Sequence, residues 1–368
     1  MGQVAVVFGG PAPEHDVSIL TGLQASRELA AAGRSPLALY WTKSGAFVSV
    51  DPTSEAAAFV DGPPRGAEQV TLASGPDGGF SAVGRLGRPR RLELDAAILC
   101  THGGPGEDGS LQAALDLAGV AYTGPTVAGA ALGMDKLAFA AVMVASGVAS
   151  LPRVALSETT SSVEFEGPYI VKPRFGGSSI GIDVVGDLAT AVARLRSNPH
   201  LAAGAVLEPF RSDLGDLQVA VRTYPTMQVS AIERPLRREG ATEILDYTDK
   251  YVPGEGMAAA ARELPAAVPD VLRDQVLAVA ARVAELSSAR GVLRVDFLHG
   301  DAGLYVNEIN TIPGSLSRYL FIDPPLAFLA LLDDLVEEAV ARPSHSYVTA
   351  GAEGTVLRAA GAIAAKLA

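Results

Sequence analysis

Residues 291–310 read GVLRVDFLHGDAGLYVNEIN, and the rest of the chain is organised around this stretch. Its alternation of apolar and polar residues predicts two strands, Val292 to Leu298 and Leu304 to Asn310, joined by a turn from His299 to Gly303. Successive side chains of a strand point to opposite faces, so polar residues two apart share one face. We therefore expect a hairpin with one polar face, symmetric about Ala302.

Two carboxylates of this hairpin are expected to face each other. The symmetric register sets Asp296 opposite Glu308 and Arg294 opposite Asn310. Opposed like charges repel. A hard cation turns that repulsion into a binding site, because Mg²⁺ takes one or two carboxylates, a carbonyl oxygen and the phosphates of a nucleotide. Arg294 can then neutralise phosphate or a developing anion beside the metal.

The alternative is an ordinary strand face that carries solvated charges. The segment that follows, Thr311-Ile-Pro-Gly314, favours the metal site, because a Pro-Gly turn exposes backbone amides next to the acidic pair.

Length and composition narrow the class of protein. A chain of 368 residues is too long for one small core and predicts two or three packed domains. It is 48% apolar and 19% charged, as soluble globular proteins are. The net charge of −12 excludes a general nucleic-acid surface or an anionic-membrane surface. A phosphate ligand must then be held by a few local cations, and the candidates are Lys136, Lys172 and Arg294.

Cysteine use and the N-terminus indicate a cytoplasmic protein. The single cysteine, Cys100, ends an apolar run, so no disulfide frame exists and we expect a buried strand thiol rather than a nucleophile. The N-terminus lacks a signal-like pattern, and no apolar run reaches membrane-spanning length. We therefore expect no membrane partner.

The N-terminal segment predicts an α/β domain. Val4 to Phe8 is an apolar run that ends in two glycines, Val17 to Ala31 has helical periodicity, and Leu37 to Trp41 is again a strand. The glycine turn lacks the G-x-G-x-x-G spacing of dinucleotide-binding folds. Glu14 lies just beyond the first strand, where open α/β sheets bind ligands. It is a candidate anchor for a substrate ammonium, and the alternative is a carboxylate that caps the helix.

A second apolar strand, Leu94 to Cys100, leads into the loop 101–112 of sequence THGGPGEDGSLQ, which presents amides and two carboxylates before a helix over Leu111 to Leu117. A glycine-rich loop this long after a buried strand is more often functional than a simple turn. Gly62 to Arg91 is rich in Gly, Pro and Arg, and it predicts a hairpin excursion on the surface.

A second glycine cluster follows a strand that carries Lys172. A helix is expected from Met134 to about Ser146. The loop Gly176 to Gly181 consists of small residues and can fold over an anion with its backbone amides. It lacks the residue order of a P-loop, so it is either a phosphate lid of another architecture or a plain hairpin turn.

Further elements lie around the acidic hairpin. Glu208 belongs to the strand Ala205 to Phe210, at a position suited to receive an adenine amino group at a hinge between domains. Residues 246–264 have the length and composition of a closing loop. Strands over 216–221 and 228–232, an amphipathic helix over 269–288 and an acidic helix over 326–341 complete the pattern.

Taken together, these segments resemble the D-alanyl-D-alanine ligase branch of the ATP-grasp enzymes. The matching motifs are Phe8-Gly-Gly, Glu14-His-Asp-Val-Ser18, His102-Gly, Gly106-Glu-Asp-Gly-Ser-Leu-Gln112, Tyr122-Thr-Gly124, Met134-Asp-Lys136, Ile170-Val-Lys-Pro173, Gly177-Ser-Ser-Ile-Gly181, Asp246-Tyr-Thr-Asp-Lys-Tyr251, Arg294-Val-Asp296 and Asn307-Glu-Ile-Asn-Thr-Ile-Pro-Gly314. They run in family order from residue 4 to about 320. Each motif is weak alone, but together in this order they are specific.

The resemblance implies an ATP-grasp fold of the α/β class. It implies an N-terminal open parallel α/β domain for the substrate over residues 1–125 and a central small α+β domain with the phosphate lid over 126–212. A C-terminal α+β domain with the metal site and the closing loop is expected over 213–345, and a tail over 346–368.

The reaction of such a ligase is implied as well. ATP phosphorylates the carboxylate of the first amino acid, the amine of the second attacks the acyl phosphate, and phosphate leaves. This chemistry depends on charge neutralisation more than on covalent help. The expected ligands are therefore ATP, two Mg²⁺ or Mn²⁺ ions, and small amino acids such as D-alanine.

The matched motifs imply roles for individual residues. Lys136 and Lys172 would hold the ATP phosphates, Glu208 the adenine and Asp216 the ribose, with Ser179 and Lys250 also at the nucleotide. Asp296, Glu308 and Asn310 would hold the two metal ions. Arg294 and the backbone amide of Gly314 would stabilise the oxyanion. Glu14 would bind the first ammonium, linked through Ser178 to Tyr251, and His102 would lie near the first carboxylate.

Two positions depart from the family pattern. Asp216 is shorter than the glutamate that is common at the ribose position. Tyr319 stands where many members carry a serine that contacts the second carboxylate, so Ser317 or Arg318 would take over that contact, or the second substrate differs. Tyr251, by contrast, resembles the members that form amides rather than esters.

The sequence therefore predicts a D-alanyl-D-alanine ligase that supplies peptidoglycan precursor in the cytoplasm, as a homodimer if it follows its family. The first alternative is a related ATP-grasp ligase that makes another dipeptide in specialised metabolism, and the altered stretch 315–319 motivates it. The second is a nucleotide-binding protein without catalysis, which conflicts with the complete set of expected metal and phosphate residues.

Overall fold

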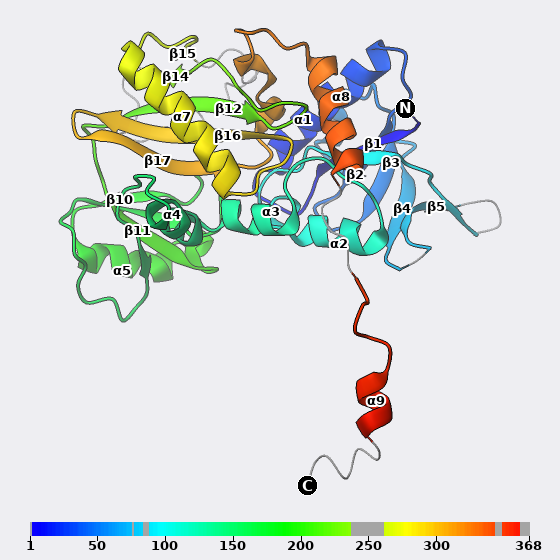
Figure 1. The fold of residues 1–368 in the computed structure, drawn as a ribbon, viewed down its shortest axis with the longest axis horizontal. Coiled ribbons are helices and arrows are strands. Elements are labelled where there is room, and N and C mark those ends of the chain that lie inside the picture. The colour runs from blue at the N-terminus through cyan, green and yellow to red at the C-terminus, as the bar shows by residue number, and fades with distance from the viewer. Residues whose placement is uncertain (1, 76, 84–87, 237–260, 343–347, 361–368) are drawn as a thin grey trace.

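The computed structural model describes residues 2–75, 77–83, 88–236, 261–342 and 348–360. Three main sheets organise them, one on the right of Figure 1 and two, one above the other, on the left. Among the described helices, none is both long and apolar enough to cross a membrane.

The first sheet has seven strands in the order β6-β5-β4-β3-β2-β1-β7. Its strands are β1 (Val4–Gly9), β2 (Leu37–Trp41), β3 (Phe47–Val50), β4 (Glu68–Ala73), β5 (Gly79–Val83), β6 (Pro89–Arg91) and β7 (Ala96–Leu99). β1 is parallel to β2 and β7, and the other pairs are antiparallel. The expected open parallel start is thus confirmed. The predicted surface excursion is wrong in one respect, because β4 to β6 continue this sheet and bury Val70 and Phe80.

Helices from both ends of the chain cover this sheet. They are α1 (His15–Ala31), α2 (Ser110–Ala118) and α8 (Phe328–Ala341). The apolar core beneath them includes Leu331 and Leu335 of α8 and also Leu316 and Leu320 of the 3-10 segment Gly314–Leu320. The residues that follow the acidic hairpin are therefore anchored on the N-terminal sheet, which brings Gly314 beside the first domain.

The second sheet is small and antiparallel, in the order β10-β9-β11-β8. Its strands are β8 (Val154–Leu156), β9 (Tyr169–Pro173), β10 (Asp183–Val185) and β11 (Ala205–Pro209). Helix α5 (Leu188–Ser197) packs on it and closes a separate core around Val171 and Leu207. The glycine-rich loop 176–181 joins β9 to β10 at the edge of this sheet.

The third sheet has the order β13-β12-β16-β17. It consists of β12 (Gly215–Arg222), β13 (Gln228–Val229), β16 (Val292–Gly300) and β17 (Gly303–Asn310), with α7 (Asp270–Leu286) packed on one face (Figure 1). A short pair, β14 (Arg234–Pro235) and β15 (Arg262–Glu263), lies beside it. The acidic hairpin is thus β16–β17, and its turn is shorter than predicted because the strands continue to Gly300 and from Gly303.

Two helices link the first sheet to the other two, where a single helix was expected. α3 (Val127–Met134) precedes α4 (Lys136–Ala145), and Asp135 separates them with non-helical φ of −85° and ψ of 95°. The Asp135 carboxylate accepts the amides of Leu137 and Ala138, each at 3.1 Å, as an N-cap does. The last described helix, α9 (Thr355–Ala360), extends away from the body (Figure 1).

Candidate active site

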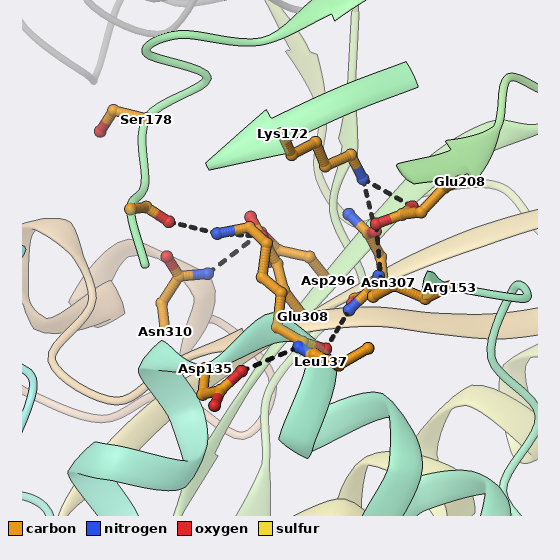
Figure 2. Close-up of polar contacts among 12 residues, drawn as sticks. Asp135, Leu137, Arg153, Lys172, Ser178, Glu208, Asp296, Asn307, Glu308 and Asn310 are labelled. Atoms are coloured by element: carbon orange, nitrogen blue, oxygen red, sulfur yellow. Dashed lines mark hydrogen bonds and ion pairs between the residues drawn. The ribbon is translucent and has the colours of Figure 1, made fainter. Parts of the chain in front are cut away.

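A pocket lies between the second and third sheets and gathers most of the expected nucleotide and metal residues. Lys172 and Glu208 come from the second sheet, and Asp296 and Glu308 come from the third (Figure 2). The other expected residues that line the pocket are Lys136, Ser179 and Asp216. Cations and carboxylates from distant segments thus converge on one cavity, which is what a polyphosphate with its metal ions requires.

Lys136 is the first residue of α4, and the cap at Asp135 fixes its position. Arg174 holds that cap with two bonds to the Asp135 carboxylate, at 2.8 and 2.6 Å. The Lys136 ammonium donates to the carbonyl of Gly176 in the glycine-rich loop and lies 3.7 Å from Glu308 Oε2. Burial lowers the pKa of Lys136, and Glu308 partly offsets this. The helix start therefore places a cation between the glycine-rich loop and β17.

Lys172 and Glu208 form a buried ion pair, with 2.9 Å between Nζ and Oε2. A second cation that the sequence did not indicate, Arg153, lies with its Nε 2.7 Å from Glu208 Oε1. Burial disfavours the charged carboxylate, but Lys172 and Arg153 outweigh it and lower the pKa of Glu208. Glu208 is thus ionised, and its interaction with adenine stays a prediction.

Asp296 and Glu308 face each other as expected, although for a different reason than hairpin symmetry. Phe297 pairs with Val306, but the next pair is Asp296 with Glu308, so Asn307 of β17 has no partner of its own on β16. This extra residue is a β-bulge, and it shifts the register by one. A bulge opposes two residues to one. Both Asn307 and Glu308 consequently line the pocket.

Polar groups already surround the two carboxylates. Arg294 binds both oxygens of Asp296, at 2.7 and 2.8 Å, and Asn310 donates to Asp296 Oδ2 at 3.1 Å. Among the described residues no cluster of three or more His, Cys, Asp or Glu could hold a metal alone. Two carboxylates and one amide oxygen suit Mg²⁺, because Mg²⁺ takes its other ligands from phosphates and water. They are too few for a metal ion that is held by protein ligands alone.

The glycine-rich loop 176–181 reaches the first domain through Ser178. Its hydroxyl donates to Oε1 of Glu14. Ser178 and Ser179 both have left-handed backbones, with φ of 52° and 58°. Glu14 occupies the N-cap position of α1 without capping it through its side chain, so the capping alternative is wrong.

Two glycines let the backbone approach Glu14 closely. A Cβ on Gly103 would lie 2.2 Å from Glu14 Oε2, and one on Gly177 would lie 2.9 Å from Oε1. A side chain at either position would displace the Glu14 carboxylate, and Gly103 in addition has a left-handed φ of 64° that favours glycine.

His102 is buried and connects the first domain to the Pro-Gly turn. Its Nδ1 donates to the carbonyl of Ile312 at 2.7 Å, so in the neutral ring Nε2 accepts from the Thr21 hydroxyl at 2.8 Å. Thr21 Oγ1 in turn accepts the Ser315 amide at 3.0 Å. Burial lowers the pKa of His102 to about 4. The charge of Arg294 also lowers this pKa, whereas the hydrogen bond to Ile312 raises it. His102 is therefore neutral at neutral pH.

Glu107 is a site residue to which sequence reasoning gave no role. Its carboxylate accepts the amides of Gly103 and Ile312 and the hydroxyl of Thr311, at 2.9 to 3.1 Å. Burial and the nearby Glu14 raise its pKa to about 7, although the three donors act in the opposite direction. Glu107 and His102 together hold the amide and the carbonyl of Ile312. The signal was the pair of carboxylates noted in loop 101–112, of which Glu107 is the first.

The residues after Gly314 adopt an unusual turn. Ser315, Leu316 and Ser317 have φ of 48° to 50°, a left-handed run that is costly for non-glycine residues. Among the described residues the buried Ser317 hydroxyl has no hydrogen-bond partner. Arg318 is exposed and lies over the ring of Phe328. Of the two residues expected to contact the carboxylate of the second substrate, Ser317 is therefore buried and Arg318 lies on the surface.

Tyr319 belongs to a polar cluster that the sequence did not reveal. Its hydroxyl donates to Glu233 at 3.4 Å, its ring lies under the Arg262 guanidinium, and Arg262 pairs with Glu233 at 3.1 Å. Burial raises the pKa of Tyr319 to about 12, and the nearby charges of Arg294 and Asp296 also act on it. Tyr319 is thus a protonated donor beside the acidic hairpin. Lys250 and Tyr251 lie outside the described residues.

Comparison with protein families gives two matches that together span most of the chain. A family described as the D-ala D-ala ligase N-terminus matches residues 3–125, and one described as the D-ala D-ala ligase C-terminus matches residues 130–337.

Individual proteins agree with these matches. A D-alanine-D-alanine ligase from Bradyrhizobium sp. (strain ORS 278) is 31% identical over 358 residues, which cover 92% of this chain and 95% of that protein. One from Mycolicibacterium paratuberculosis is 31% identical over 364 residues and covers 92% and 97%. The crystal structure of the D-alanine-D-alanine ligase from Helicobacter pylori superposes with a TM-score of 0.72 at 24% identity, over 92% of this chain and 99% of that one. At that identity the superposition supports the fold.

Proposed function

The chain belongs to the D-alanyl-D-alanine ligase family of ATP-grasp enzymes, and we propose that the pocket between its second and third sheets carries out the ATP-dependent joining of two D-alanine molecules for peptidoglycan precursor synthesis. The observation that carries the assignment to this pocket is the convergence of Lys136, Lys172, Asp296 and Glu308 on one cavity. Two lysines and two carboxylates from opposite walls match the charge of a nucleotide with its metal ions.

We assign the nucleotide residues as follows. Lys136 and Lys172 bind the phosphates, Glu208 and Asp216 bind the adenine and the ribose, and Ser179 and Lys250 complete the nucleotide site. Asp296, Glu308 and Asn310 hold two Mg²⁺ ions, for which Mn²⁺ can substitute. Bound there, the ions neutralise the charge that develops as the phosphoryl group moves.

The amino acids lie at the mouth of this pocket, toward the first domain. Glu14, held by Ser178, binds the first ammonium, with Tyr251 as its further partner. His102, neutral and fixed by Thr21 and Ile312, orients the first carboxylate for attack on ATP.

The second half of the reaction needs an oxyanion site. The amine of the second D-alanine attacks the acyl phosphate, and Arg294 with the amide of Gly314 stabilises the negative oxygen before phosphate leaves. The Arg294 side chain is fixed by its two bonds to Asp296, so it is preorganised for this task.

The experiment that tests this function measures phosphate release from ATP and Mg²⁺ with D-alanine, beside other D- and L-amino acids and D-lactate, with mass detection of the products. We expect turnover with D-alanine alone and a product of two D-alanine residues. Turnover only with a mixed pair of amino acids would contradict the assignment of the second substrate and leave the ATP chemistry intact.

We also propose that the protein acts as a homodimer in the cytoplasm. The support for the compartment is the single, fully buried cysteine and the use of ATP. The support for the homodimer is membership of the family alone. Light scattering after gel filtration tests it, and a monomer mass across the working concentration range would contradict it.

A further inference from the structure

The inference concerns Arg153, which lies beneath the nucleotide pocket and matches no motif of the sequence. Strand β11 runs between β9 and β8 in the second sheet. Leu207 pairs with Val154 in β8, so the same register sets Arg153 opposite Glu208. On the other side Val206 pairs with Lys172, two residues before Glu208 and on the same face. Strands β9 and β11 and the residue that directly precedes β8 therefore present a cation, a carboxylate and a cation in a row.

The contacts match this register. Arg153 Nε lies 2.7 Å from Glu208 Oε1, and Lys172 Nζ lies 2.9 Å from Oε2 (Figure 2). The side chains of Arg153 and Glu208 are 2% and 1% exposed. Lys172 and Glu208 line the pocket, whereas Arg153 reaches Glu208 from the buried side.

Arg153 also fixes both of the segments that carry the other pocket charges. One terminal nitrogen donates to the carbonyl of Lys136 at 2.7 Å, and the other donates to the carbonyl of Asn307 at 3.1 Å. The first carbonyl begins α4, and the second belongs to the bulge that turns Glu308 into the pocket. One guanidinium thus connects a phosphate lysine, the metal strand and the Glu208 carboxylate.

Binding of ATP changes the charge balance of this row. When the Lys172 ammonium turns to the phosphates, Glu208 loses one of its two counter-ions. A buried carboxylate without a cation is strongly unfavourable, so a Lys172 that is the only partner of Glu208 would be held back from the nucleotide. Arginine suits the role of a permanent partner because it stays charged in a buried setting.

We propose that Arg153 is a positioning residue for ATP: it remains the counter-ion of Glu208 and thereby frees Lys172 to bind the phosphates. The proposal rests on the nucleotide role of Lys172 and Glu208 proposed above. It adds to that role a residue that touches neither ATP nor metal.

The test measures ATP affinity by calorimetry and the separate KM values for ATP and D-alanine. Arg153→Met removes the charge and keeps an unbranched apolar stem. We expect ATP binding at least about tenfold weaker and a KM for D-alanine within about twofold, since a tenfold change is the loss of one charge-assisted bond. Arg153→Lys keeps the charge and should recover at least half of the ATP affinity that Arg153→Met loses, measured on a logarithmic scale. A lysine variant that binds ATP as poorly as a folded methionine variant would overturn the proposal.

A double variant tests the charge balance directly. In the Arg153→Met background, Glu208→Gln keeps a side-chain oxygen that accepts the adenine amino group, but it removes the unpaired carboxylate and releases Lys172, so the double variant should bind ATP at least about threefold tighter than Arg153→Met alone. Equal or weaker binding would overturn the proposal. The melting temperature shows whether Arg153→Met folds. If it does not fold, Arg153→Lys tests the proposal instead, and this variant must bind ATP within about threefold of the unchanged protein.

Two controls separate this inference from the site assignment. Arg196→Met breaks an exposed arginine–glutamate pair of the same domain, with 2.8 Å between Arg196 Nε and Glu158 Oε1, and should leave ATP binding within about twofold. Lys172→Met should weaken ATP binding. Unchanged binding in Lys172→Met would remove the nucleotide role of the pocket itself, whereas a weakened Lys172→Met beside an unaffected Arg153→Met would overturn the Arg153 proposal alone.

Discussion

Asp296 and Glu308 lie directly opposite each other on β16 and β17, and each carboxylate has its own cation. Arg294 binds Asp296 through two bonds, and Lys136 lies 3.7 Å from Glu308. Each carboxylate therefore has a positive charge beside it, which offsets the repulsion between the two before any ligand binds. In the function proposed above, this pair supplies the two carboxylate ligands of the divalent ions.

The first prediction concerns this pair. Glu308→Gln should lower kcat by at least about a hundredfold, because a neutral amide is a much weaker ligand for Mg²⁺ than a carboxylate. The fold should remain, since Glu308 is at the pocket wall and not in the apolar core. Phosphate release with D-alanine measures the first effect, and the melting temperature measures the second.

The matched control for that variant is Asp301→Asn, which removes an exposed carboxylate from the turn of the same hairpin. It should leave kcat within about twofold, as surface changes usually do. An active Glu308→Gln enzyme would remove Glu308 from the metal site.

The second prediction follows from the low pKa of His102. The folded value of about 4 lies below the ordinary 6.5, because burial disfavours the charged ring. The unfolded chain therefore takes up a proton between pH 6.5 and 4 that the folded chain does not, and stability falls as the pH drops through that window. The full loss from this one group is about 3 kcal/mol.

The measurement compares the free energy of unfolding in denaturant for the unchanged protein and for His102→Gln at pH 7.5 and pH 4.5. The unchanged protein should lose more stability than the variant on acidification. Equal losses in the two proteins would show that His102 is not held neutral by burial.

The third prediction separates the two expected ligands of the second carboxylate. Ser317→Ala should raise the KM for the second D-alanine about two- to tenfold, which is the net value of one hydrogen bond. Arg318→Met should leave it unchanged, because Arg318 is exposed and packs on Phe328. Steady-state kinetics at saturating ATP measure both, and the reverse order of effects would assign the contact to Arg318.

The fourth prediction concerns Glu107, whose two oxygens accept three hydrogen bonds. A glutamine has one carbonyl oxygen and one amide, so Glu107→Gln must lose the Gly103 bond or the pair of bonds from Thr311 and Ile312. We expect a loss of about 1–3 kcal/mol in stability. We also expect a raised KM for the first D-alanine, because Gly103 lies against Glu14.

For that variant the KM for ATP is the internal control, since Glu107 lies away from the nucleotide residues and should not change it. Should both KM values rise together, the variant would have disturbed the whole site and not the Gly103 loop in particular.

Much of the fold was predictable from the sequence because it is written in local patterns. The apolar run at Val4, the helical period from Val17 and the alternation from Val292 each depend on neighbouring residues only. The strands β1, β2 and β7 and the helices α1 and α7 are confirmed for this reason. The helix expected from Met134 to about Ser146 is confirmed as α4, whereas the separate helix α3 that precedes it was not predicted.

The site was predictable to the extent that motifs carried it. Lys172, Glu208, Asp296 and Glu308 are brought together as expected. Sequence reasoning assigned no role to Arg153, Glu107 or Glu233, because each acts through partners that are distant in sequence. Arg153 contacts Glu208 of the neighbouring strand β11, and Glu107 contacts Ile312, which is 205 residues away.

The sequence by itself determined the α/β class, the order of the family motifs and the identity of the residues that we propose for the nucleotide site, because side-chain chemistry and local periodicity are properties of the chain alone. Only the tertiary structure decided the bulge at Asn307, the row of Arg153, Glu208 and Lys172, and the hold of His102 and Glu107 on Ile312. The physical reason is that strand register and contacts between domains are set by the packing of whole sheets, and no local stretch of sequence contains that information.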